Sequence, residues 1–291
     1  MRCLPPIAAI GVCVLTTLTV GCGRQTTTGS ATPAREPWRP RALTDVVFEA
    51  TPARRDAGEY LVEGVLQCFV CHSERDWSKP GAPPVEGRAG AGAVWWDKPW
   101  LVAPNLTPDP ETGIARWTDD MLARAIREGV SHDGRILDPQ MWSASFRNLT
   151  DEELASVVVY LRSRPPVRNA LPVTTPPAGA DPPDPPAPRS GTPMAFVSGL
   201  ERGGHLVALA DCAGCHSSWH TPRNPGLFGG GNLIERAGGR AFSANLTSAP
   251  SGIPYYDAAM FREVMRTGRV KGRTLNPVMP WTAFRHLADA D

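Results

Sequence analysis

The sequence of 291 residues has almost no net charge, because 30 lysines and arginines face 29 aspartates and glutamates. Without a basic excess there is no electrostatic attraction for nucleic acid, so no nucleic-acid partner is expected. Long apolar runs are equally scarce. The longest candidate, roughly Ile7 to Val20, is too short and too rich in threonine and glycine to span a bilayer stably. The composition therefore indicates ordinary globular domains.

The apolar run near the N-terminus has the features of an export signal. Arg2 precedes it, and Leu18-Thr19-Val20-Gly21-Cys22 resembles a bacterial lipoprotein box with threonine where leucine is usual. We therefore predict a signal peptide over residues 1–22, cleaved before Cys22. A lipid on Cys22 would anchor the protein to a membrane from the periplasmic side. Plain secretion, with Cys22 left as a thiol, is the alternative.

Cysteine is scarce outside two short motifs. Of seven cysteines, Cys3 and Cys13 fall inside the predicted leader and Cys22 at its end. The other four form Cys68-Phe69-Val70-Cys71-His72 and Cys212-Ala213-Gly214-Cys215-His216. No cysteine pair is left for a structural disulfide, so the oxidising compartment would serve the chemistry of these two motifs.

Each motif has the form Cys-x-x-Cys-His, the attachment sequence of c-type haem, in which both thiols bond to the haem vinyl groups and the histidine ligates the iron. A thioredoxin-like pair would sit beside a βαβ unit, and no plausible buried strand precedes either copy. A zinc ribbon would place its two pairs roughly 15–20 residues apart and give the histidines no role. We therefore predict two covalent haems c, on Cys68 and Cys71 and on Cys212 and Cys215, with His72 and His216 as proximal ligands.

Three helices are expected in the first half of the chain. Residues 56–67 place apolar side chains on one helical face just before the first motif. Residues 117–128 repeat apolar positions at helical spacing, with Thr118 as N-cap. The capping box Thr150-Asp151-Glu152-Glu153 begins a third helix, which Pro165-Pro166 ends.

Short segments of the first half return in the second. Gly58-Glu59-Tyr60-Leu61 corresponds to Gly203-Gly204-His205-Leu206, Asn105-Leu106-Thr107 to Asn245-Leu246-Thr247, and Pro139-Gln140-Met141 to Pro277-Val278-Met279. The matches predict a duplicated domain. We expect a flexible tether over residues 23–51, repeat 1 over 52–164, a proline-rich linker over 165–193 and repeat 2 over 194–291.

Methionine is the expected distal ligand of both irons, because a thioether suits haem iron and raises its reduction potential. Met141 and Met279 lie in proline-containing extended segments that can cross the distal haem face. Met121 and Met260 also correspond, but their places on apolar helix faces favour a packing role. A second histidine is the alternative distal ligand. The candidates are His132, His205, His220 and His286.

The order of motifs resembles the cytochrome c subunits of membrane-associated alcohol and gluconate dehydrogenases and their diheme relatives. It runs from Cys-x-x-Cys-His through Asn105–Ile114 and Gly129–Arg135 to Pro-x-Met and a closing Tyr160–Ser163 helix. The resemblance implies an all-α fold of two tandem class I-like cytochrome c domains joined by the proline-rich linker. It also implies Met141 and Met279 as distal ligands.

One difference from that pattern concerns the closing helix, which repeat 2 lacks in this sequence. We expect a truncated record of a longer protein or a second domain that melts well below the first, with Leu206 and Leu209 partly exposed. In repeat 1 the corresponding helix carries a row of apolar residues whose burial would stabilise the domain. They are Leu154, Val157, Val158 and Leu161.

Two classes of function fit these expectations. In the first, both irons are six-coordinate and the protein carries electrons from a periplasmic or membrane dehydrogenase, or from quinol, to another cytochrome or an oxidase. In the second, one iron has an exchangeable ligand and the protein is a haem enzyme, such as a diheme peroxidase or a sulfur-compound oxidase. A methionine for each haem favours the carrier, and no acid/base pair points to catalytic residues.

Overall fold

The computed structural model describes residues 38–181, 183–184, 198–218, 226–236 and 239–291. Several predicted features lie outside these residues: the signal peptide with Cys22, the first part of the tether, the end of the linker and His220. Residues 39–291 form one compact unit, which contains both haem motifs. No helix in the described part of the chain is long and apolar enough to cross a membrane.

Repeat 1 contains five helices, one of them extended by a π-helix, and one two-stranded sheet within its described residues. The elements are α1 (Pro52–Glu59), the π-helix η1 (Tyr60–Val65), α2 (Cys68–Cys71), β1 (Ala93–Val94), β2 (Val102–Ala103), α3 (Asp119–Glu128), α4 (Ser143–Phe146) and α5 (Asp151–Ser163). The antiparallel pair β1–β2 joins Val94 to Val102.

Repeat 2 follows a similar order in the residues described. The elements are α6 (Gly199–Leu209), α7 (Cys212–His216), β3 (Leu233–Arg236), β4 (Gly239–Phe242), α8 (Ala258–Thr267), β5 (Arg269–Val270), β6 (Arg273–Thr274) and α9 (Trp281–Phe284). Helices make up only 33% of the structure, and three small antiparallel sheets are present that the all-α expectation did not include. Each is short because it closes a loop and forms no core layer.

Two of the three predicted helix starts, at Thr118 and Thr150, are observed. The Thr118 hydroxyl accepts a hydrogen bond from Met121 N at 3.2 Å, and Thr150 forms a full capping box with Glu153. The first helix begins earlier than predicted, because the Thr51 hydroxyl caps it and Pro52 occupies its first turn. In η1 the backbone hydrogen bonds join residues five apart in sequence, whereas those of an α-helix join residues four apart. Leu66 N, for example, donates to Leu61 O at 2.8 Å. A π-helix often lies beside a functional site.

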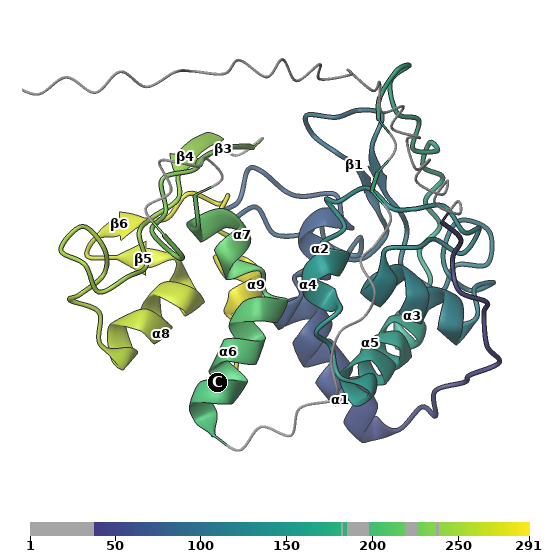
Figure 1. The fold of residues 1–291 in the computed structure, drawn as a ribbon, viewed down its shortest axis with the longest axis horizontal. Helices are drawn as coiled ribbons and strands as arrows, with labels where there is room; N and C mark the ends of the chain where they lie inside the picture. Colours follow the sequence, from purple (N-terminus) through teal and green to yellow (C-terminus); the bar gives the residue numbers. More distant parts are fainter. Residues whose placement is uncertain (1–37, 182, 185–197, 219–225, 237–238) are drawn as a thin grey trace, which may run out of the picture. The chain divides into compact units, whose positions relative to one another are not determined.

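Helix α1 packs against α5, and the two lie side by side in Figure 1. Gly58 lies at their closest approach, where a methyl group in place of its hydrogen would overlap the Ser156 carbonyl and Tyr160. The apolar face of α5 is buried as predicted: Leu154, Val157, Val158 and Leu161 are each at most 5% exposed. The helix that begins at the capping box therefore buries the apolar face that its sequence pattern predicts.

The two repeats share one core, and this overturns our expectation for Leu206 and Leu209. Both are buried, at 7% and 0% exposure, because they pack into the hydrophobic cluster that η1, α3 and α5 form in repeat 1. The cover that we expected from a closing helix is supplied by the other repeat.

The contacts between the repeats are reciprocal. Helix α9 of repeat 2 packs on η1, and α4 of repeat 1 packs on α6. The Tyr60 hydroxyl donates to Asp291 Oδ2 at 2.5 Å, while His205, at the matching position of repeat 2, lies 2.9 Å from Glu153 Oε1. Corresponding elements therefore exchange contacts, as in an interface with approximate two-fold symmetry.

Part of the predicted tether has defined contacts. Arg41 in this extended segment forms ion pairs with Asp120 at 2.6 Å and Glu128 at 2.7 Å, both on α3. Thr44 N and Phe48 N donate to the carboxylates of Asp120 and Asp119. The Arg41 guanidinium, whose hydrogen bond outweighs burial, lowers the pKa of Asp120 to about 2. Residues 39–51 therefore run along α3 in repeat 1.

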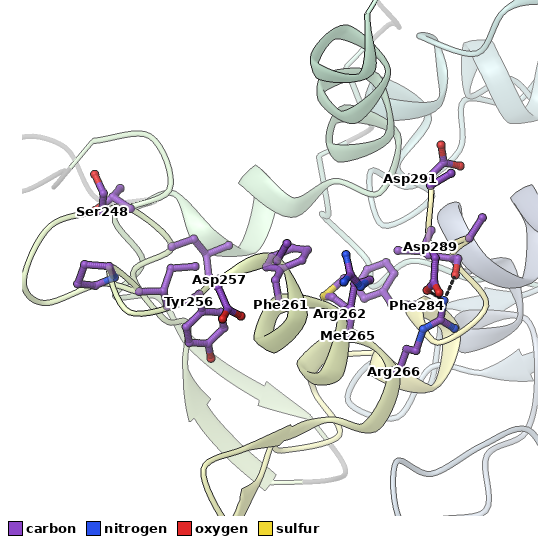
Figure 2. Close-up of a pocket in the computed structure, with 18 residues that line it drawn as sticks. Ser248, Tyr256, Asp257, Phe261, Arg262, Met265, Arg266, Phe284, Asp289 and Asp291 are labelled. Atoms are coloured by element: carbon purple, nitrogen blue, oxygen red, sulfur yellow. Dashed lines mark hydrogen bonds and ion pairs between the residues drawn. The ribbon is translucent and has the colours of Figure 1, made fainter.

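A groove on repeat 2 is lined by α8, α9 and the loop that begins at Leu246. Figure 2 shows Phe261, Met265 and Phe284 gathered in its middle. The corresponding face of α3 in repeat 1 carries Leu122 and is covered by α5. Leu122 is 2% exposed, whereas Phe261 is 48% exposed. No residue of the two Cys-x-x-Cys-His motifs lines this groove, but Leu246 and Thr247 of the repeated Asn-Leu-Thr triplet do.

Candidate functional site

Each haem motif begins at a residue in the left-handed backbone region. Gln67, with φ of 55°, follows η1 and turns the chain into α2, and Asp211, with φ of 52°, does the same before α7. Such a turn places both cysteines of a motif on one short helix, followed at once by the histidine. This geometry fits the two neighbouring attachment points of one haem c.

Both predicted proximal histidines are held in the same way. His72 Nδ1 lies 2.8 Å from the carbonyl oxygen of Pro104, and His216 Nδ1 lies 2.8 Å from that of Ala244. A carbonyl can only accept, so Nδ1 carries the proton and Nε2 presents a lone pair. This is the tautomer that a metal-ligating histidine needs, and the hydrogen bond to the carbonyl fixes it.

Burial favours the uncharged forms of the histidine and cysteine side chains in both motifs. Desolvation lowers the pKa of His72, and likewise that of His216, so both imidazoles stay neutral near pH 7. Burial also raises the pKa of Cys68 to about 12 and that of Cys212 to about 11. These residues thus present uncharged thiols beside neutral imidazoles, which fits an apolar macrocycle. None of the motif cysteines is disulfide-bonded.

A second set of hydrogen bonds holds the backbone around each histidine. Gly92 N donates to His72 O at 2.8 Å, and Gly230 N donates to His216 O at 2.7 Å. The serine after each histidine accepts from a loop amide: Ser73 Oγ from Gly90 N at 2.9 Å and Ser217 Oγ from Phe228 N at 3.0 Å. The motif is therefore repeated together with the loop that faces it.

The asparagine of the repeated Asn-Leu-Thr triplet is a functional residue whose role the sequence did not reveal. It directly follows the carbonyl that accepts from the histidine. Asn105 Oδ1 accepts from Thr107 N at 2.9 Å, and Asn245 Oδ1 accepts from Thr247 N at 2.8 Å. Both bonds fix the loop that holds this carbonyl. Recurrence of the triplet, and of serine after each Cys-His pair, is the signal that could have identified it.

The predicted distal methionines occupy equivalent turns. Asp138 Oδ1 accepts from Gln140 N at 2.9 Å, and Asn276 Oδ1 accepts from Val278 N at 2.9 Å. The methionine amides bond back to the carbonyls of the same two residues, at 2.9 Å and 3.0 Å. Each Asx-Pro turn thereby fixes the backbone at Met141 or Met279. Both methionines therefore stand in a turn and not within a helix.

The competing ligands have other contacts. Met121 Sδ accepts from Thr118 N at 3.5 Å within the cap of α3. His132 stacks on Trp117 with ring centres 4.3 Å apart, and His205 is paired with Glu153. His286 is exposed. In the described part of the chain no three His, Cys, Asp or Glu side chains converge as a metal-ion site.

A second pocket adjoins the first motif. It is lined by Cys71, by Ser73 and by a group of tryptophans in the loop after the motif. Trp95 and Trp96 stack with ring centres 4.1 Å apart, and Trp77 is 40% exposed. Trp95 and Trp96 therefore pack on one another in the wall of a pocket that Cys71 also lines.

Comparison with known proteins points to the same cofactor as the two motifs. No family model matches the chain. It is 42% identical over 107 residues to a nicotinate dehydrogenase subunit of Pseudomonas putida, covering 36% of this chain and 8% of that protein. It is 28% identical over 275 residues to the fructose dehydrogenase cytochrome subunit of Gluconobacter japonicus, covering 84% of this chain and 52% of that protein. It is also 28% identical over 180 residues to a diheme cytochrome c-type protein of Cereibacter sphaeroides, covering 54% of each.

The chain is similar to diheme cytochromes c. Its resemblance to the cytochrome c subunits of dehydrogenases is confirmed, and its cofactor is covalently bound haem c. The chain spans only about 8% to 54% of the length of these curated relatives. Electron transfer is the general function that the relatives support.

Proposed function

We propose that this chain is an electron-transfer subunit with two haems c, each ligated by histidine and methionine. It accepts electrons from a dehydrogenase, or from quinol, and passes them to another cytochrome or an oxidase. Haem c supplies reversible one-electron chemistry at iron when bound. The ligands that we assign are His72 with Met141 for haem 1, and His216 with Met279 for haem 2.

One observation carries the proposal: both repeats combine an oriented histidine with an Asx-Pro-Met turn. His72 and His216 each donate from Nδ1 to a loop carbonyl at 2.8 Å, and Met141 and Met279 follow equivalent turns. A carrier would hold each iron with two protein ligands, since a ligand set that stays closed changes little between oxidation states. A haem enzyme would need one iron with an open or exchangeable position.

The protein chain has a defined task at each site. The cysteines hold the cofactor, and the Pro104 and Ala244 carbonyls keep each histidine in its ligating tautomer. Burial of His72 and His216 keeps the imidazoles neutral. The methionine, a soft neutral ligand, favours the reduced state and sets a potential suited to accepting electrons from a dehydrogenase.

Replacing the distal ligand tests the assignment. Met141→Ala should abolish the sulfur-to-iron charge-transfer absorption of haem 1 and lower one of two reduction potentials, because a neutral sulfur ligand is lost. Met121→Ala is the matched control, since its sulfur caps α3, and it should leave the spectrum unchanged. The reverse pattern would refute the assignment. High-spin ferric iron or rapid reaction with peroxide in the unaltered protein would favour a haem enzyme.

The proposed location is the periplasmic side of a bacterial membrane, with a lipid on Cys22 as the anchor. The sequence Leu18-Thr19-Val20-Gly21-Cys22 supports this proposal. Mass spectrometry of the mature N-terminus would test it. We expect a diacylated or triacylated Cys22 as the first residue, and an unmodified N-terminus after cleavage elsewhere would refute the anchor.

A further inference from the structure

After α5 the chain turns back over repeat 1 instead of leaving it. Residues 167–175, here called the strap, lie in the first part of the proline-rich linker. Asn105 Nδ2 donates to Val167 O at 2.7 Å, and Val167 N donates to Thr107 Oγ1 at 3.0 Å. Further along, Thr175 N bonds to Trp100 O at 2.9 Å. The strap is thus bound to repeat 1 along its length.

The strap bonds to both backbone segments that hold His72. Asn105 directly follows Pro104, whose carbonyl accepts from His72 Nδ1. On the other side, Asn169 Nδ2 donates to Ala91 O at 2.8 Å, next to Gly92, whose amide donates to His72 O. Asn169 N also bonds to Thr112 Oγ1 at 3.0 Å, and that hydroxyl accepts from Asn105. The strap therefore joins the two supports of one histidine.

The strap covers the loop that follows Pro104, and its Asn169 and Leu171 also line the pocket beside Cys71. Asn105 and Thr107 are 2% and 1% exposed, and His72 is 6% exposed. The Leu171 side chain packs at Gly92, where no larger residue would fit. The hydrogen bonds of the loop are consequently made in a dry environment, where they are stronger and open less often.

Repeat 2 has the same inner hydrogen bonds without such a cover in the residues described. Asn245 Nδ2 bonds to Ser251 Oγ at 3.0 Å, and Asn245 and Thr247 are only half-buried. Its motif backbone is supported from another direction, by Asn232 Nδ2, which donates to Cys215 O and Ser217 O. Asn232 also pairs with Ser243, the residue before Ala244, because Ser243 N donates to Asn232 O at 2.9 Å, but Ala244 itself is exposed.

We propose that the strap is a positioning element for the proximal ligand of haem 1, and that Asn169 is its main positioning residue. The inference rests on the proposed function, because it assumes that His72 ligates haem iron. Access of water to the groups that surround a metal's ligands changes the reduction potential of the metal. By covering the loop beside His72, the strap would give haem 1 the higher reduction potential of the two centres.

The test uses the full chain with both haems and compares Asn169→Ala with Val173→Ala. Val173 lies in the strap but is 81% exposed, so its replacement should change nothing. Asn169→Ala should lower one of the two potentials in a spectroscopic redox titration, because water then reaches the proximal loop and stabilises the oxidised iron. It should also speed hydrogen exchange of one proximal imidazole Nδ1 proton about tenfold, as local opening becomes easier.

A reciprocal variant assigns the two centres without relying on their distal ligands. Asn245→Ala loosens the equivalent loop of repeat 2. It should lower the other reduction potential and speed exchange of the other imidazole Nδ1 proton, which are the two quantities that Asn169→Ala leaves unaffected. Equal changes at both centres in Asn169→Ala, or no change at either, would overturn the role of the strap. If Met141→Ala and Met279→Ala leave the ligation intact, the proposed ligands fail, while proton exchange at the two histidines still decides the role of the strap.

Discussion

Repeat 1 and repeat 2 hold their predicted proximal histidines with the same hydrogen bonds but support those bonds with different parts of the chain. In repeat 1 the strap and α5 cover the loop and the helices, so Asn105 and Leu122 are buried. In repeat 2 the matching Asn245 is half-buried and Phe261 is 48% exposed. The local geometry of a haem motif is therefore set by nearby sequence, whereas its burial depends on which other segments pack against it.

The junction between the repeats shows a second difference. His205 replaces Tyr60 in the repeated pattern, and each of these side chains bonds to a carboxylate of the other repeat. Gln67 Nε2, just before the first motif, also donates to Ala210 O, two residues before the second motif, at 3.1 Å. The segments that begin the two motifs are consequently in direct contact, which places the haem attachment sites of one chain next to one another.

The largest contrast between the repeats is expected at two matched arginines. Arg127 donates to the carbonyls of Leu149 and Thr150, and Arg266 donates to those of Arg285 and Leu287. The Arg127 side chain is 7% exposed and that of Arg266 is 41% exposed. Arg127→Ala should lower the free energy of unfolding by roughly 3 kcal/mol, because it leaves buried carbonyls unpaired, and Arg266→Ala by only about 1 kcal/mol. Urea unfolding of both variants measures this, and equal losses would mean that the repeats are equally buried here.

A smaller contrast is expected at two matched glycines. Gly58 lies against α5, whereas Gly203 has no atom of the described residues within 4 Å of the position a methyl group would take. Gly58→Ala should therefore destabilise by about 2 kcal/mol through overpacking. Gly203→Ala should stabilise by about 0.5–1 kcal/mol, because alanine is the better helix former. Thermal unfolding of both variants in the same buffer gives the two values. A loss of stability in Gly203→Ala would mean that another segment packs against α6 at Gly203.

Helix caps should respond alike in the two repeats, which sharpens the comparison. The Thr118 hydroxyl accepts from Met121 N at 3.2 Å, and Asp257 Oδ1 accepts from Met260 N at 2.7 Å. A cap acts within one turn, so Thr118→Ala and Asp257→Ala should each cost about 1 kcal/mol of unfolding free energy. The same urea experiment checks them. A loss of unfolding free energy in Thr118→Ala but not in Asp257→Ala would contradict the view that local interactions are equivalent in the two repeats.

The smallest expected effect is the pH dependence of the junction. Burial opposes ionisation of Glu153, but hydrogen bonds from His205 and Thr150 N outweigh it and lower the pKa of this carboxyl. Arg202 is the other nearby charge. Because the folded pKa lies below the unfolded value of about 4.3, the stabilisation is present above that pH and is lost as pH falls through the folded pKa.

Urea midpoints measured from about pH 6 to pH 3 should therefore decline less steeply in Glu153→Gln than in the unaltered protein. Glu74→Gln, at a carboxylate with a 64% exposed side chain, is the matched control and should retain the original slope. An unchanged slope in Glu153→Gln would show that the junction does not depend on this charge.

Short motifs were enough to predict the cofactor and two of the three helix starts before any fold was known. Cys-x-x-Cys-His twice identifies haem c because the attachment chemistry needs these five positions in order, and Thr118 and Thr150 begin helices because capping is a contact within one turn. Such signals span only a few residues, so they can be found without knowing the fold.

What covers each repeat became visible only in the folded chain. The repeat pattern led us to expect Leu206 and Leu209 on a partly exposed face, yet both are buried by repeat 1. The proline-rich segment has the composition of a linker, yet Val167 and Asn169 bond to the loop beside His72. Burial and backbone hydrogen bonds between residues far apart in the chain depend on which surfaces meet in space, and that information does not reside in any short stretch of sequence.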